Sequence, residues 1–127
     1  MLFKYQYRSL IWALIIAILS FIPGKDIPFV SYWDIFSIDK FAHVFFYAVL
    51  CFFMMQGAAK QYGFEKQRFA IPIIIILSGT IFGVVIEILQ PILQNDRYFD
   101  ILDITANAAG CVIGFFIFNF VYSKKIN

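Results

Sequence analysis

Polar side chains that could do chemistry occur in two short clusters of an otherwise apolar chain. The first cluster, D-K-F-A-H at positions 39–43, opens an apolar run, and the second lies between two apolar runs at positions 87–107. Ionisable groups inside a membrane span are costly unless paired or hydrated, and by default they mark a functional site. We therefore predict that both clusters meet in one polar site. Its candidate residues are Asp39, Lys40, His43, Tyr47, Glu87, Gln90, Arg97, Asp100, Asp103 and Asn107.

These residue types suit proton transfer and the binding of an anion. His43 with Glu87 or Asp103 would form an acid–base pair, and these three are the predicted catalytic residues. The guanidinium of Arg97 and the ammonium of Lys40 would hold a phosphate or carboxylate group. The remaining members are predicted to orient or contact a ligand, and they are Asp39, Tyr47, Gln90, Asp100 and Asn107.

A divalent metal is a weaker alternative for the same side chains. Carboxylates and imidazole hold such ions in hydrolases, and the candidate ligands would be Asp39, His43, Glu87 and Asp103. However, the chain has no adjacent metal motif such as HExxH, and its cysteines lack CxxC or Cys/His spacing. We therefore predict no metal site and name no cofactor. Both cysteines lie inside apolar runs, where we expect small buried side chains.

Four apolar runs must position these residues. A membrane-spanning helix needs about 20 mostly apolar residues, and 62% of this chain is hydrophobic, against about half in soluble domains. We predict an all-α integral membrane protein, a four-helix bundle in a single domain over 1–127. The segment 25–38 is predicted to lie along the membrane surface as a loop or short helix, and Asp39 to begin the second helix as N-cap or first-turn residue. The predicted helices are at about 8–23, 39–59, 69–93 and 101–122.

The distribution of basic residues predicts the orientation of these helices. Seven of the ten Lys and Arg residues lie in the two terminal segments and the 60–68 connection, and three lie in the other two connections. Cytoplasmic loops carry an excess of Lys and Arg. Both termini are therefore predicted in the cytoplasm, with the polar site on the external side of the cell membrane. The chain has no basic patch, so nothing supports nucleic-acid binding.

Small residues predict how the third and fourth helices pack. Gly79 and Gly83 precede Glu87 at four-residue spacing, which permits close approach of a neighbouring helix. We predict that this row faces the fourth helix and brings Glu87 next to the polar residues there. The matching row on the fourth helix comprises Asp103, Asn107, Gly110 and Gly114.

In order and spacing, these residues resemble the VanZ-like family. The chain reads D-K-x-x-H from Asp39, E-x-x-Q from Glu87 and R-x-x-D-x-x-D-x-x-x-N-x-x-G from Arg97, and the resemblance covers most of its length. It implies a small multi-helix membrane protein. It also implies a link to teicoplanin resistance, through the member that gave the family its name. The resemblance implies no defined reaction.

Two classes of function stay open, and a third ranks last. The first is an enzyme or binding protein for an amphiphile of the cell envelope, such as a lipid carrier, a cell-wall precursor or a lipoglycopeptide. The second is a non-catalytic envelope protein whose polar cluster is structural. The third is a small transporter, which would need to dimerise because four short helices make a thin pathway. Membrane lipids and an amphiphilic ligand are the expected partners, and the sequence sets no oligomeric state.

Overall fold

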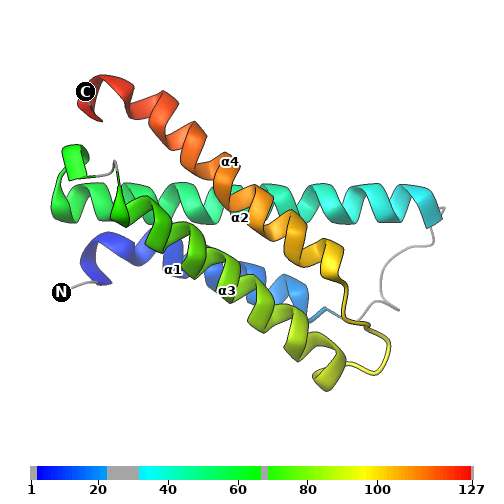
Figure 1. The fold of residues 1–127 in the computed structure, drawn as a ribbon. Helices are drawn as coiled ribbons and strands as arrows, with labels where there is room; N and C mark the ends of the chain where they lie inside the picture. The colour runs from blue at the N-terminus through cyan, green and yellow to red at the C-terminus, as the bar shows by residue number, and fades with distance from the viewer. Residues whose placement is uncertain (1–2, 23–31, 67–68, 127) are drawn as a thin grey trace.

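Four helices arranged as a bundle make up the protein in a computed structural model, which describes residues 3–22, 32–66 and 69–126. Consecutive helices run in opposite directions, so both ends of the chain lie at one end of the bundle (Figure 1). No strand occurs in these described ranges, and the all-α prediction is confirmed. The elements are α1 (Phe3–Ser20), α2 (Tyr32–Tyr62), the short 3₁₀ helix η2 (Phe64–Lys66), α3 (Ala70–Leu93) and α4 (Ile101–Ile126).

Three of the described helices are long and apolar enough to cross a membrane. α1 is not among them, because its first two turns carry Lys4, Gln6 and Arg8. The prediction of a helical membrane bundle is therefore confirmed with three candidate spans. The fourth span and the cytoplasmic side of the termini stay predictions. The three spans are Ile38–Tyr62 of α2, Ala70–Leu93 of α3 and Ile101–Lys125 of α4.

α2 begins earlier than the sequence patterns indicate. The predicted start at Asp39 is wrong, because α2 begins at Tyr32 and Asp39 lies about two turns inside it. Residues 32–38 contain neither proline nor glycine, so nothing in this stretch interrupts a helix. The segment predicted to lie on the membrane surface therefore belongs to α2 from Tyr32 onward. Its other part, residues 25–31, lies outside the described residues.

Glycines on α4 allow its backbone to approach α2. A Cβ atom at Gly110 would lie 2.5 Å from the carbonyl oxygen of Val44, and one at Gly114 would meet the backbone of the next turn of α2. A Cβ atom at Gly83 of α3 would lie 2.7 Å from Asn107 Nδ2 on α4. The predicted contact between the two rows is therefore right for Gly83 and wrong for Gly110 and Gly114. α4 packs more extensively on α2 than on α3, so its glycines face α2.

The centre of the bundle is an apolar core. Both cysteines are free and fully buried within it, as expected for small apolar side chains. Polar residues of the predicted site lie toward one end of this core, where Tyr47 is the first of its buried members on α2. The principal buried side chains are Ile16, Tyr47, Leu50, Cys51, Met55, Ile75, Cys111 and Phe118.

Alanine in place of Gly110 should destabilise the bundle, because its Cβ atom would push α4 away from the α2 backbone. Overpacking of a close-packed interior costs typically about 1–3 kcal/mol. We expect Gly110→Ala to lower the free energy of unfolding in detergent by that amount, as measured by circular dichroism. Ala109→Val adds bulk at an exposed position of the same helix and should change this free energy by less than about 0.5 kcal/mol. Equal losses in both variants would contradict the close approach.

Candidate functional site

The polar residues singled out in the sequence gather at the end of the bundle opposite the two chain ends. The C-terminal ends of α1 and α3 meet the N-terminal parts of α2 and α4 there (Figure 1). Because the helices alternate in direction, side chains far apart in the sequence reach a common layer. The residues linked there by hydrogen bonds or ion pairs are Asp39, Lys40, His43, Glu87, Asp100, Asp103 and Asn107.

The imidazole of His43 lies at the centre of this cluster and faces polar groups through both ring nitrogens. Nδ1 lies 2.8 Å from Asn107 Oδ1 and 3.9 Å from Glu87 Oε1. Nε2 lies 3.8 Å from Asp39 Oδ1 and 3.7 Å from Asp103 Oδ2. Since an amide oxygen only accepts, Nδ1–H donates to Asn107, and Nε2 carries the lone pair of the neutral ring. His43 and Glu87 therefore meet as the sequence predicts.

Lys40 ties α2 to the beginning of α4. Its Nζ donates to Asp100 Oδ2 at 2.7 Å and to Asp103 Oδ1, and it lies 3.7 Å from Asp39 Oδ2. The hydrogen bond from Lys40 lowers the pKa of Asp100, which lies in the connection before α4. Carboxylates of the protein therefore compensate the charge of Lys40, and its predicted contact with a ligand stays a prediction.

Glu87 is buried, and the described part of the chain does not give it the hydrogen bonds that a carboxylate needs. Its side chain is 1% exposed. Neither of its oxygens has a hydrogen-bond partner among the described residues, and His43 Nδ1 faces it beyond hydrogen-bond distance. Burying a charge without such partners destabilises a protein. The fold alone therefore does not account for a glutamate at this position.

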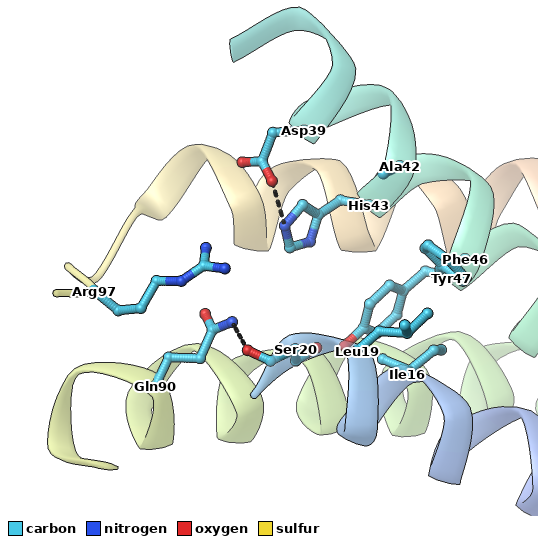
Figure 2. Close-up of a pocket in the computed structure, with 10 residues that line it drawn as sticks. All are labelled: Ile16, Leu19, Ser20, Asp39, Ala42, His43, Phe46, Tyr47, Gln90 and Arg97. Atoms are coloured by element: carbon cyan, nitrogen blue, oxygen red, sulfur yellow. Dashed lines mark hydrogen bonds and ion pairs between the residues drawn. The ribbon is translucent and has the colours of Figure 1, made fainter. Parts of the chain in front are cut away.

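A cavity of about 200 Å³ lies beside His43. Figure 2 shows Arg97, which comes from the connection before α4, reaching toward the same space as Asp39 and His43. The side chain of Arg97 forms no hydrogen bond or ion pair within the described part of the chain, and its Nε is buried without a partner there. The residues lining the cavity are Ile16, Leu19, Ser20, Asp39, Ala42, His43, Phe46, Tyr47, Gln90 and Arg97.

The sequence analysis did not predict that α1 contributes to this site. Gln90 Nε2 donates to the carbonyl oxygen of Ser20 at 2.8 Å, and Gln94 Nε2 donates to that of Phe21 at 2.7 Å. The last carbonyl groups of a helix have no intrahelical partner, so these two amides complete the end of α1. The available signal was the four-residue spacing of the glutamines, which puts them on one face.

Three side chains of the cluster have the arrangement of metal ligands. Among the described residues, one donor atom from each of Asp39, His43 and Asp103 lies within 4.8 Å of the others. Glu87, the fourth ligand of the alternative drawn from the sequence, lies on the opposite side of the imidazole, near Nδ1. Of the four metal ligands considered from the sequence, three could therefore bind one ion, and the fourth, Glu87, lies on the other side of the imidazole.

Methionine in place of Lys40 should destabilise the protein, because it leaves Asp100 and Asp103 without their donor. Breaking a fully buried pair costs about 3–5 kcal/mol. Since the side chains of Lys40 and Asp100 are 18% and 37% exposed, we expect a loss of about 1–3 kcal/mol in unfolding free energy near neutral pH. Lys66→Met, at an exposed lysine at the other end of the bundle, should have little effect.

The loss caused by Lys40→Met should also depend on pH. The pKa of Asp100 is lowered in the folded protein. Its contribution is therefore present above the ordinary pKa of an aspartate, about 4, and is lost as the pH falls through the lowered value. Unfolding free energies of both proteins near pH 7 and pH 3 would check this. A loss that is equally large at both pH values would count against the role of Asp100.

Glutamine in place of Glu87 should leave the stability unchanged or raise it. Glutamine keeps the size of the side chain and removes a charge that has no hydrogen-bond partner within the described ranges. We expect thermal unfolding in detergent, followed by tryptophan fluorescence, to occur at the same or a higher temperature. Asp103→Asn weakens the ion pair with Lys40 and should lower that temperature. A similar fall for Glu87→Gln would instead indicate a purely structural carboxylate.

Comparison with known proteins identifies the family. A family model described as VanZ/LLP1 matches residues 2–122, nearly the whole chain. No curated protein and no solved structure matches the chain. The family match agrees with the order and spacing of the polar residues and with the three candidate membrane spans. The chain belongs to the VanZ/LLP1 family and is a VanZ-like membrane protein.

Proposed function

We propose that this protein binds the anionic headgroup of an amphiphilic or lipid-linked molecule of the cell envelope. The observation that carries the proposal is the side chain of Arg97 in the cavity wall, with a buried Nε that has no partner among the described residues. A guanidinium offers a planar set of donors that matches phosphate and carboxylate oxygens. A bound oxyanion would give Arg97 the partner that the described residues do not supply.

The size of the cavity supports a headgroup as its occupant. At about 30 Å³ for each water molecule, a volume of about 200 Å³ accommodates a handful of waters. That space suits a phosphate or carboxylate group with its nearest atoms. It is too small for a lipid chain, so the apolar part of the ligand would lie outside it.

The apolar wall of the cavity supports an amphiphile over a free anion. Ile16 and Leu19 of α1 and Phe46 of α2 line the side away from Arg97. Leu19 is 42% exposed, and Ile18 beside it is 59% exposed, so this wall continues onto the outer surface of α1. A hydrocarbon chain could leave the cavity along this surface and remain in the membrane.

Catalysis on the bound headgroup is a second candidate, and Glu87 is the observation that favours it. A buried carboxylate that lacks hydrogen bonds is retained at the expense of stability, which is common where a group has a chemical role. In this version His43, Glu87 and Asp103 keep the acid–base roles predicted from the sequence. Binding without catalysis requires only Arg97 and the cavity.

The link to teicoplanin resistance that the family resemblance implies is compatible with binding alone. A lipoglycopeptide, or the cell-wall precursor that it recognises, is an amphiphile of the proposed class. The excess of basic residues at the opposite end of the bundle supports an external position for the site, where either molecule would be met. A dimeric transporter would need a pathway to the other end, and the apolar core there offers no polar continuation of the cavity within the described residues.

Glutamine in place of Arg97 should weaken binding of a lipid that carries a phosphate. Native mass spectrometry of the purified protein would measure binding of added dioleoyl phosphatidic acid or dioleoylglycerol. The two lipids have the same acyl chains, and only the first carries a phosphate. Loss of hydrogen bonds to a charged group is worth about 1.5–3 kcal/mol, so phosphatidic acid should bind about 10–100-fold more weakly.

Arg8→Gln provides a matched control for this test. Arg8 is exposed at the other end of the bundle, where it donates to Gln56 Oε1 at 2.9 Å. The Arg8→Gln variant should bind phosphatidic acid as strongly as the unaltered protein does. Equal binding of the two lipids to the unaltered protein, or equal losses in Arg97→Gln and Arg8→Gln, would refute an anion-binding cavity.

A further inference from the structure

The carboxylates of Asp39 and Asp103 each direct one oxygen to Lys40 and the other to His43. Asp39 Oδ2 lies 3.7 Å from Lys40 Nζ, and Asp103 Oδ1 accepts a hydrogen bond from it. The other two oxygens, Asp39 Oδ1 and Asp103 Oδ2, lie 3.8 and 3.7 Å from His43 Nε2. Lys40 therefore hydrogen-bonds one oxygen of Asp103 and forms an ion pair with one oxygen of Asp39, which leaves the other oxygen of each carboxylate beside the same ring nitrogen.

In the neutral form of the ring, His43 Nε2, Asp39 Oδ1 and Asp103 Oδ2 face one another with no hydrogen to share. The distances to Nε2 exceed the range of about 2.7–3.2 Å for a hydrogen bond. His43 Nδ1 donates to Asn107 Oδ1, so Nε2 of the neutral ring presents a lone pair to two carboxylate oxygens. Nitrogen and oxygen ligands lie about 2.0–2.2 Å from a bound zinc ion, which separates neighbouring ligands by about 3–4 Å. The two separations from Nε2, 3.8 and 3.7 Å, match this range, and the three donor atoms all lie within 4.8 Å of one another.

We propose that Asp39 Oδ1, His43 Nε2 and Asp103 Oδ2 bind a divalent first-row transition-metal ion. One imidazole with two carboxylates is a donor set suited to Zn²⁺ or Mn²⁺ rather than to Mg²⁺ or Ca²⁺, which prefer oxygen ligands alone. Asp39 and His43 also line the cavity. The ion would therefore have open coordination positions on the side where a ligand enters, as in metal sites with three protein ligands.

Glu87 provides a second, independent observation that supports a cation. This side chain is 1% exposed, its oxygens lack hydrogen-bond partners among the described residues, and it faces Nδ1 of the same imidazole at 3.9 Å. A buried carboxylate is stabilised by positive charge nearby. An ion on the far nitrogen of His43 would supply that charge through the ring, while Asn107 holds the ring in place as an outer partner of a metal ligand.

The formal charges of the site favour the same conclusion. Four carboxylates oppose one lysine and one arginine, which leaves two negative charges with His43 neutral. A divalent ion cancels this excess, which an anionic ligand alone would increase. The residues counted are Asp39, Glu87, Asp100 and Asp103 against Lys40 and Arg97.

This inference deepens the proposed function, because the ion would accept an oxygen of the headgroup that Arg97 holds. The two can nevertheless fail separately, since an ion is measurable without any lipid. Lipid binding depends on Arg97, and ion binding depends on the three ligands. Arg97→Gln removes a positive charge near the site and should leave the affinity for an ion unchanged or higher.

The first experiment titrates the full chain in detergent, without an affinity tag or added lipid, with Mn²⁺ alone. The decrease in the electron paramagnetic resonance signal of free Mn²⁺ measures binding. We expect saturable binding of one ion per chain, which Zn²⁺ displaces and an equal concentration of Mg²⁺ does not. Absence of saturable binding, or displacement by Mg²⁺ as effective as by Zn²⁺, would overturn the proposal.

The second experiment compares Asp39→Asn with Asp100→Asn. Both variants remove one carboxylate beside Lys40, but only Asp39 presents an oxygen to His43. The side chain of Asp39 is 41% exposed, so its replacement should leave the fold intact, which circular dichroism would verify. We expect Mn²⁺ affinity to fall at least about tenfold in Asp39→Asn and to stay close to that of the unaltered protein in Asp100→Asn. Equal losses would indicate general attraction of cations and would overturn the site.

Discussion

Carboxylates inside an apolar bundle need positive charge or hydrogen-bond donors from the protein itself, and this need governs the polar end of the molecule. Lys40 meets it on one side, where its ammonium contacts carboxylates from α2, α4 and the connection before α4. Because these groups belong to different elements, satisfying them also fixes α2 against α4. On the other side, the imidazole of His43 at 3.9 Å is the only ion-pair partner of Glu87 among the described residues. The cluster is therefore compensated around Lys40 and incomplete around His43.

The small residues of α4 make this arrangement possible. Gly110 lets the α4 backbone approach Val44, one residue after His43. A bulkier residue would widen the gap between the helices and carry Asn107 away from the ring to which it hydrogen-bonds at 2.8 Å. The polar contacts at the end of the core therefore depend on the same helix separation as the apolar packing within it. A change in helix separation would be felt first at hydrogen bonds, because their strength falls steeply with distance.

Most of the correct predictions about the site came from the spacing of residues along single helices. The four-residue interval between Asp39 and His43, and that between Asp103 and Asn107, put each pair on one helix face, and alternating helix directions brought the faces together. The neighbour of each face was harder to predict. In a chain this apolar, hydrophobic periodicity does not distinguish a face packed on protein from one in lipid. For this reason the glycines of α4 were assigned to the wrong helix, and the contribution of α1 was not predicted.

The incomplete side of the cluster is also the side that lines the cavity, and this coincidence favours a ligand over a structural role. A purely structural network would be expected to satisfy Glu87, since a half-satisfied polar network is less stable than an apolar core. The residues on this side instead include both a positively charged donor and negatively charged oxygens whose interactions are incomplete. Arg97 offers donors without an acceptor among the described residues, while Asp39 and Asp103 offer oxygens beside a ring nitrogen. The donors around this cavity suit an anion, and the acceptors suit a cation. The site is therefore complementary to an anionic ligand that binds together with a cation.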